Sequence, residues 1–464
     1  MTEIKISELL NKDKAGKIYK IKGWIRTARQ SKNITFLEIN DGSVINNLQI
    51  ILEEKNIENY ESLLDDLTTG SSIEIEGLLI ESPAKGQEVE LSASRIKIIG
   101  KCPSDLYPLQ KKRHSFEYLR SILHLRSRTN TQGAVVRIRS TLSFSIHKFF
   151  QERGFLYIQT PIITGSDCEG AGEMFRVTTL DLANIQKNDE GLVDYNEDFF
   201  GKQTFLTVSG QLNVEPFCCS LGNVYTFGPT FRAEKSNTSR HCSEFWMIEP
   251  EIAFAGLKEN MELAEDCLKY IMNELLILRE EDLNFLDKWV ENGLITKLKN
   301  IVNKSFKHIT YAEAIDILAN SKQQFEYPVF WGTDLQAEHE RYITEKAFDC
   351  PVIVTNYPKE IKAFYMRLDD DEKTVSAMDV LVPGVGEIVG GSVREEREDV
   401  LIRRIKEMNL NIEDYIWYLE LRKFGTIPHA GFGLGFDRLV QYSTGMTNIR
   451  DVIPYPRTPK NALF

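Results

Sequence analysis

FRAEKSNTSRHCSEFWMIEPE, residues 231–251, carries more information about this 464-residue chain than any other segment. Its pattern predicts two strands joined by a polar loop of nine residues, 235–243. Arg232 has a planar, permanently charged head that suits a phosphate oxygen, and Phe245 offers a flat face to a purine ring. His241 lies in the loop, within reach of further phosphates. The segment predicts nucleotide binding, although an ordinary hairpin with surface charges would leave the same pattern.

A second segment, GFGLGFDR at residues 431–438, places a glycine at every second position. In a strand these glycines lie on one face and leave a strip of bare backbone against which a flat ring can lie. The segment lacks the GxGxxG pattern of dinucleotide sites and the GxxxxGK pattern of P-loops. A nucleotide bound here would therefore be held by aromatic stacking and by arginines, including Arg438 at the start of the next helix.

Groups that suit the other parts of a substrate stand elsewhere in the chain. In GEIVGGSVR, residues 386–394, Glu387 is suited to ligate Mg²⁺ beside triphosphate oxygens. Arg394 extends a fork toward the space that the paired glycines open. The small-residue loop that begins with Glu169 offers one carboxylate to an ammonium group. Further neutral and acidic groups follow at Ser209, Gln211 and Glu215.

Residues 1–102 are predicted to form a small β-barrel. Strand signals occur at residues 19–28, 35–40, 47–52, 72–80 and 88–99. Asp41-Gly42 marks a tight turn between two of them. Five short strands in this length suit a closed barrel of the OB type, a common nucleic-acid-binding scaffold, although an SH3-like barrel leaves a similar pattern.

The rest of the chain is predicted to be a linker and a second, larger domain. Residues 103–130 contain two prolines and a basic run and are typical of a linker or hinge. From residue 131 to 464 we expect one domain that begins with a long helix and carries a polar surface insertion at about 181–203. Further helices are expected near residues 258–278, 311–318, 336–346, 397–408 and 412–423. Because the strands between them are unevenly spaced, a doubly wound parallel sheet is not expected.

Composition and charge limit the class of protein. The net charge is −12, yet residues 12–32 and 111–139 each hold eight Lys or Arg against one acid, which predicts two phosphate-binding surfaces or two solvated faces. The chain opens without a secretory signal and has no apolar run long enough to span a membrane. Seven cysteines without a CxxC pair argue against a structural zinc site and a disulfide framework. We therefore expect a reduced, cytoplasmic protein.

Together these segments resemble the three ordered motifs of the class II aminoacyl-tRNA synthetases. The helix from residue 131, the strand after it and Pro161 are similar to the first motif, which forms the dimer interface in that family. Residues 231–251 are similar to the second motif, and residues 431–438 to the third. A barrel ahead of them, with the run GWIR at 23–26, narrows the resemblance to the aspartate, asparagine and lysine subgroup. The resemblance implies an α+β fold, in which an N-terminal OB-fold barrel precedes a catalytic domain built on an antiparallel sheet flanked by helices. It also implies ATP as a substrate, a tRNA partner and a homodimer.

Within the subgroup the residues favour the asparagine-specific members. Aspartate-specific members carry a lysine that pairs with the substrate carboxylate, and Val214 stands at that position here, followed by Glu215. A carboxylate accepts the N–H of a side-chain amide, while Arg394 donates to its carbonyl. Aspartate would set two carboxylates against each other, at a cost of roughly several kcal/mol. The ending at residues 456–459, PRTP, is also similar to the asparagine-specific members. The predicted substrates are L-asparagine and tRNA(Asn).

The resemblance assigns roles to individual positions. It implies that the amino acid is bound by Glu169, Ser209, Gln211, Glu215 and Arg394. ATP would be bound by Arg232, Glu234, His241, Phe245, Glu387, Gly435 and Arg438, with Arg232, Glu387 and Arg438 as the catalytic residues. Mg²⁺ would be ligated by Glu387 and by Asp379, eight residues earlier. The anticodon would meet Arg26, Arg29, Phe36 and Gln49.

Three alternatives stay open from the residues alone. The nearest is an aspartyl-tRNA synthetase, one that charges both tRNAs included. The second is an asparagine synthetase that needs no tRNA and is built on the same catalytic fold, against which the barrel argues. The third is a non-catalytic nucleic-acid-binding protein, against which Arg232 and Arg438 argue.

Overall fold

The structure is a computed structural model that describes residues 3–84, 86–110, 112–166, 173–235 and 238–464. Its internal contacts divide the chain into two compact units, Met1–Ala134 and Val135–Phe464. Each unit has its own buried core, and each is described by itself below.

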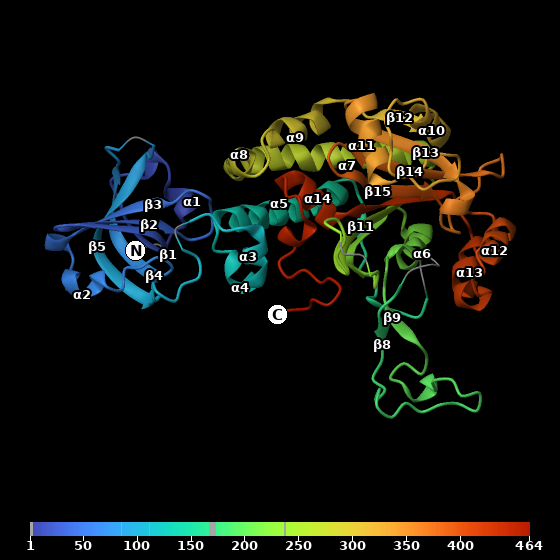
Figure 1. The fold of residues 1–464 in the computed structure, drawn as a ribbon, viewed down its shortest axis with the longest axis horizontal. Helices are drawn as coiled ribbons and strands as arrows, with labels where there is room; N and C mark the ends of the chain where they lie inside the picture. Colours follow the sequence, from blue (N-terminus) through green and yellow to red (C-terminus); the bar gives the residue numbers. More distant parts are fainter. Residues whose placement is uncertain (1–2, 85, 111, 167–172, 236–237) are drawn as a thin grey trace. The chain divides into compact units, whose positions relative to one another are not determined.

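The first unit is a closed five-stranded barrel with strand order β1-β2-β3-β5-β4 (Figure 1). The strands are β1 Ile18–Ser31, β2 Ile34–Asn40, β3 Leu48–Glu53, β4 Ser72–Glu81 and β5 Val89–Gly100. Alternate residues fill the interior; in β3, for example, Leu48, Ile50 and Leu52 are buried and the residues between them are half-buried. The predicted OB-type barrel and its five strands are confirmed. Two short helices, α1 Ile6–Leu9 and α2 Tyr60–Leu64, add Ile6, Leu9 and Tyr60 to the same core.

The segment predicted as a linker has secondary structure of its own. It contains two short helices, α3 Phe116–Ser121 and α4 Leu123–Arg126. Ser115 caps α3 by accepting a hydrogen bond from the backbone N–H of Tyr118. Leu119 and Leu123 are buried, so this segment is packed and is not an extended, solvent-exposed linker.

The second unit is built on an eight-stranded sheet with order β12-β13-β14-β15-β16-β11-β10-β6. The strands are β6 Leu156–Tyr157, β10 Val224–Phe231, β11 Glu244–Ala253, β12 Lys307–Thr310, β13 Val352–Pro358, β14 Thr374–Val382, β15 Gly386–Val393 and β16 His429–Gly435. All neighbours pair antiparallel except β6 with β10 and β12 with β13, which confirms the expected antiparallel sheet. Nearly every residue of β14 is buried, as expected of a strand covered on both faces.

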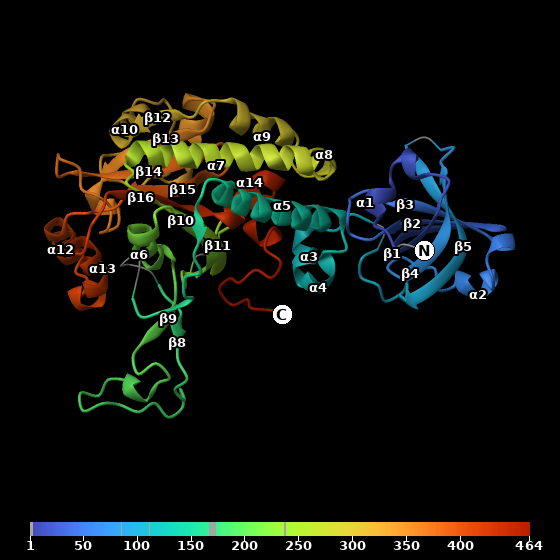
Figure 2. The same ribbon diagram turned by 180° about the vertical axis from the view of Figure 1, so that it is seen from behind.

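Helices cover the sheet on both sides (Figures 1 and 2). They are α5 Asn130–Glu152, α6 Gln211–Leu221, α7 Leu257–Leu278, α8 Glu280–Trp289, α9 Leu294–Asn303, α10 Tyr311–Ala319, α11 Ala337–Tyr342, α12 Glu398–Glu407, α13 Ile416–Lys423 and α14 Phe436–Thr444. Helix α7 packs on β14, β15 and β16, whereas α6 packs on β10 and β11. The long first helix and the five later predicted helices are confirmed, but α6, α8 and α9 were not predicted. No helix in the described part of the chain is both long and apolar enough to cross a membrane.

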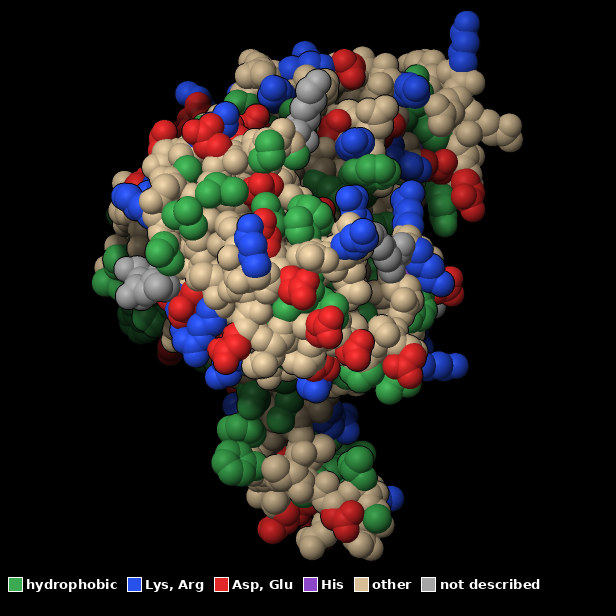
Figure 3. Space-filling model, turned by 90° about the vertical axis from the view of Figure 1, so that its left-hand side faces the viewer, with side chains coloured by type: hydrophobic (Ala, Val, Ile, Leu, Met, Phe, Trp, Pro, Cys, Tyr) green, Lys and Arg blue, Asp and Glu red, His purple; other side chains and the backbone are tan. Residues whose placement is uncertain are grey.

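A protruding segment, residues 178–203, leaves the domain between β8 Arg176–Val177 and β9 Thr204–Leu206. These strands and β7 Ile163–Thr164 form a small third sheet at its base. The segment carries exposed hydrophobic side chains, among them Leu182 and Phe199, next to acidic ones (Figure 3).

Candidate active site

One cavity of about 150 Å³ gathers every side chain that the sequence assigned to ATP. It is bounded by β11, β15, β16, the start of α14 and the loop after β10. Its lining includes Arg232, Glu234, His241, Phe245, Glu387, Gly435 and Arg438. Arg240, Cys242 and Trp246 complete the wall on the loop side.

The hairpin of β10 and β11 positions the cationic side chain of Arg232 and the aromatic ring of Phe245. Thr230 pairs with Phe245 across the hairpin, and β10 ends at Phe231. Arg232 is the next residue, two positions after the partner of Phe245. Its guanidinium stands over the Phe245 ring, 5.4 Å from the ring centroid. Arg438 enters from α14 and donates a hydrogen bond of 3.1 Å to the carbonyl oxygen of Glu387. Two fixed cations therefore face one small cavity.

The glycine strip of β16 is only partly bare. Gly433 and Gly435 line the cavity, as the sequence predicted. Gly431 does not, because Glu251 covers it: a Cβ at Gly431 would lie 2.4 Å from the Glu251 carboxylate oxygen and 2.3 Å from the carbonyl oxygen of Pro250. At this position the glycine makes room for a buried carboxylate and not for a flat ring.

The two predicted Mg²⁺ ligands face the same space. A Cβ at Gly390 would lie 2.9 Å from an oxygen of Glu387 and 3.4 Å from Oδ1 of Asp379. The other oxygen of Asp379 accepts a hydrogen bond of 2.7 Å from Lys362. A β-bulge between Val380 and Leu381 shifts the register of β14 against β15, which puts an extra residue between the two acids in sequence.

Glu340 is a third acid at this place, and the sequence did not predict it. Glu340 falls in the helix predicted near residues 336–346 and was assigned no role, yet its carboxylate accepts the backbone N–H of Glu387, 47 residues away, at 3.3 Å. Burial and the neighbouring Glu387 carboxylate raise the pKa of Glu340 to about 8. No local signal separates Glu340 from a surface acid, because its surroundings come from strands far along the chain.

The residues predicted to bind the amino acid meet beside β11. Ser209 precedes α6, Gln211 and Glu215 lie on its first turns, and Arg394 follows β15. Gln211 donates to Oε1 of Glu215 at 3.0 Å, and the Arg394 Nε lies 4.0 Å from the same oxygen. All four side chains are buried. The fifth predicted residue, Glu169, lies outside the described residues.

Two buried glutamates of β11 belong to this group and had no predicted role. Ser209 Oγ and the backbone N–H of Gly210 both donate to the Glu249 carboxylate. Glu251 binds the Arg394 guanidinium through two hydrogen bonds. The available signal was the pair of acids at alternate positions of a predicted strand, which sets both on one face, since buried carboxylates are rare unless paired. Both residues are less than a tenth exposed.

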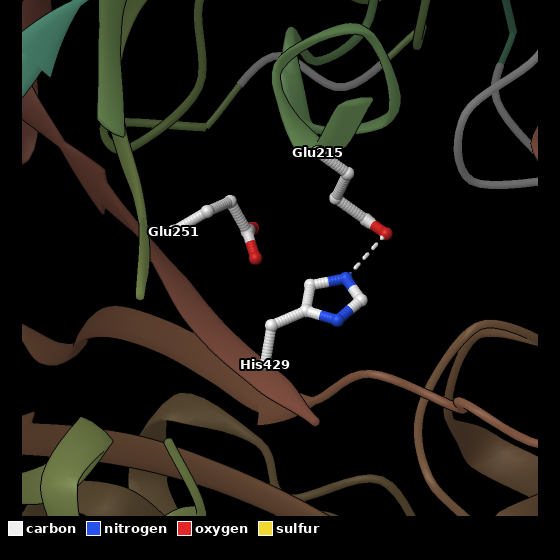
Figure 4. A group of neighbouring side chains, drawn as sticks. All are labelled: Glu215, Glu251 and His429. Atoms are coloured by element: carbon white, nitrogen blue, oxygen red, sulfur yellow. Dashed lines mark hydrogen bonds and ion pairs between the residues drawn. The ribbon is translucent and has the colours of Figure 1, made fainter. Parts of the chain in front are cut away.

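Glu215 is fully buried. Burial alone would raise the pKa of its carboxyl, but the hydrogen bond from His429 and the charges of Arg422 and Arg394 outweigh burial and lower that pKa well below its ordinary value. This lowered pKa favours the ionised form of the Glu215 carboxyl. Figure 4 shows the carboxyl groups of Glu215 and Glu251 and the His429 ring converging from α6, β11 and β16.

The predicted anticodon residues lie on β1, β2 and β3 of the barrel. Arg29 pairs with Phe36 across β1 and β2, and its guanidinium stands 5.6 Å from the ring centroid. Gln49 on β3 donates to Glu90 at 3.0 Å. Arg26 lies at a bulge in β1, where it donates to the carbonyl oxygen of Arg128. Arg29 and Phe36 thus form a cation–π pair on the barrel, whereas Arg26 binds the backbone of the segment that follows the barrel.

Comparisons with known proteins agree with this arrangement. The family model described as tRNA synthetases class II (D, K and N) matches residues 115–459, and that of the OB-fold nucleic acid binding domain matches residues 19–99. The asparagine--tRNA ligase of Acetivibrio thermocellus is 60% identical over 98% of this chain and 97% of its own. That of Protochlamydia amoebophila is 61% identical over 96% and 95%. The crystal structure of asparaginyl-tRNA synthetase from Pyrococcus horikoshii, complexed with asparaginyl-adenylate, superimposes with a TM-score of 0.86 at 31% identity and 99% coverage of both chains.

Proposed function

The chain belongs to the asparagine--tRNA ligases, within the class II tRNA synthetases for aspartate, lysine and asparagine, and we propose that its nucleotide cavity and the residues around Glu215 together carry out that reaction. L-asparagine is activated with ATP to asparaginyl-adenylate, and the asparaginyl group is then transferred to the 3′ end of tRNA(Asn). The observation that carries the proposal is the buried Glu215–Arg394 pair, in which Arg394 directly follows β15, a strand that also lines the arginine-lined cavity.

In the first step the asparagine carboxylate attacks the α-phosphorus of ATP in line, and pyrophosphate leaves. Arg232, held over Phe245, stabilises the charge that builds on the α-phosphate, and Arg438 faces the outer phosphates. Neither side chain changes covalently, so the site acts by position and charge. Ser209 and Gln211 orient the head of the amino acid toward the phosphate.

The acids at β14 and β15 fit a magnesium ion. Glu387 and Asp379 turn carboxylate oxygens toward one space above Gly390, and hard oxygen ligands of this kind suit Mg²⁺. Glu387 and Asp379 would hold the ion, with Glu340 beside them. When bound, the ion neutralises charge on the triphosphate oxygens.

In the second step the 3′-hydroxyl of the terminal adenosine of tRNA attacks the carbonyl carbon of the adenylate, and AMP leaves. The barrel binds the anticodon, where Phe36 offers a stacking face and Arg29 a positive charge. We further propose a homodimer in the cytoplasm, formed through α5 and β6. This surface carries the exposed hydrophobic residues Val136, Phe144 and Leu156.

Replacing Arg232 tests the proposal. Arg232→Ala should lower asparagine-dependent exchange of pyrophosphate into ATP by at least about a hundredfold, because a fixed donor to the transition-state charge is lost. Arg403→Ala, at a half-exposed arginine of α12, is the matched control and should retain exchange. Near-normal exchange by a folded Arg232→Ala protein would refute the assignment.

A further inference from the structure

The two oxygens of the Glu215 carboxylate are held unequally. Oε2 faces three donors: the Tyr418 hydroxyl at 2.7 Å, the His429 Nε2 at 3.0 Å and the Arg422 guanidinium at 3.3 Å. Oε1 accepts one hydrogen bond in the described part of the chain, from Gln211. A carboxylate oxygen has two lone pairs, so Oε1 retains acceptor capacity that Oε2 has used. Oε1 is also the oxygen that lies nearer to Arg394.

The three donors are themselves fixed by the fold. Tyr418 and Arg422 stand one turn apart on α13, and Arg422 donates to the Tyr418 hydroxyl at 2.9 Å. Arg422 also donates to the carbonyl oxygen of Glu395 at 2.9 Å. His429, the first residue of β16, sets its Nδ1 3.0 Å from the carbonyl oxygen of Ile427. All three side chains are buried.

The second buried glutamate of this cluster, Glu251, is also ion-paired. Glu215, Glu251 and His429 lie close enough to resemble a metal site, with ligand atoms within 4.8 Å of one another. Yet the Glu251 carboxylate accepts hydrogen bonds from the Nε and Nη2 atoms of Arg394. Oε2 of Glu215 accepts from Arg422 and Tyr418. Among the described residues, the Arg394 and Arg422 guanidinium groups match the charges of the two glutamates, and Oε1 is the Glu215 oxygen that accepts fewer hydrogen bonds.

We propose that Tyr418, Arg422 and His429 are positioning residues for amino-acid specificity, which lock Oε2 of Glu215 so that Oε1 alone is presented, beside Arg394, to the side-chain amide of the substrate. This inference rests on the proposed function. An amide N–H donates to the fixed Oε1. The side-chain carboxylate of aspartate would instead face the Glu215 anion, which is held in position and repels it. Specificity against aspartate therefore depends on α13 and β16 as well as on Glu215 itself.

Tyr418→Phe is the sharpest test, because it removes one hydroxyl and leaves the ring. The probes are the sulfamoyl analogues of asparaginyl-adenylate and aspartyl-adenylate, with binding measured by calorimetry on the full chain. We expect the asparaginyl analogue to bind about tenfold more weakly, the cost of losing one hydrogen bond to a charged group. The aspartyl analogue should bind with unchanged or higher affinity, because a loosened Glu215 repels it less.

The control is Tyr442→Phe. The Tyr442 hydroxyl is buried and has no hydrogen-bond partner among the described residues, so this change should leave both affinities as they are. Equal weakening of both analogues by Tyr418→Phe, or no change in either, would overturn the inference. Should Tyr418→Phe fail to fold, His429→Gln carries the same test. A wild-type protein that lacks asparagine-dependent exchange would instead refute the proposed function, so the two failures are distinguishable.

Discussion

Single residues in this molecule take their roles from partners far along the chain. The sequence predicted Phe245 on a strand and Arg438 at a helix start, and the structure has both there, because their segments have a local pattern of their own; Arg232, predicted in a strand, lies one residue past the end of β10. Glu340 and Glu251 were not found. Each is an ordinary acid in its own segment and becomes special only against Glu387 or Arg394.

The glycine at 431 provides a residue-scale prediction. Gly431→Ala should lower the free energy of unfolding by about 1–3 kcal/mol, because the new methyl group meets backbone and the Glu251 carboxylate. It should also lower asparagine-dependent exchange, since Glu251 holds Arg394. Gly433→Ala is the comparison: its methyl meets only the flexible end of Met247. Urea unfolding of both variants checks this, and equal losses of stability would contradict it.

Secondary-structure elements were predictable where one period dominates. The barrel strands and the long helices α5 and α7 show strong alternation or a clear helical face, and they were predicted within a few residues. Helix α6 was not predicted. It contains Pro216 and buries Glu215 and Gln211 among apolar residues, so its pattern is irregular. The polar groups that disguise the helix are the ones that form the amino-acid pocket, which is why local rules fail at this element.

Helix α5 provides an element-scale prediction. Phe144 is 69% exposed on it, which is costly for a free surface and suits a subunit interface. Phe144→Asp should convert the dimer to a monomer in sedimentation experiments. Glu152→Lys, at the exposed end of the same helix, changes charge and should leave the dimer intact. A monomeric wild type, or a dimeric Phe144→Asp protein, would argue against this interface.

At the scale of the whole molecule, the candidate sites are divided between the two units. The catalytic unit holds both the nucleotide cavity and the amino-acid pocket, whereas the barrel holds the Arg29–Phe36 pair. We therefore propose that chemistry on asparagine and ATP depends on the catalytic unit and that binding of the tRNA anticodon depends on the barrel. The relatives and the matching family models exclude the non-catalytic alternative and favour asparagine over aspartate.

Phe36→Ala tests this division of labour. It removes a stacking face worth about 1–3 kcal/mol per base, so the KM for tRNA(Asn) should rise about tenfold or more. Exchange of pyrophosphate without tRNA should be unchanged. Ile18→Ala, at an exposed position on the barrel away from Phe36 in the sequence, should affect neither assay. A loss of exchange in Phe36→Ala would show that the barrel contributes to activation.

The central claim is that the buried Glu215 carboxylate, beside Arg394, selects an amide over a carboxylate. The most direct measurement is pyrophosphate exchange by the wild-type protein with asparagine and aspartate side by side. A like-charge contact at this site predicts kcat/KM for asparagine at least about a hundredfold above that for aspartate. Comparable exchange with aspartate would contradict the account.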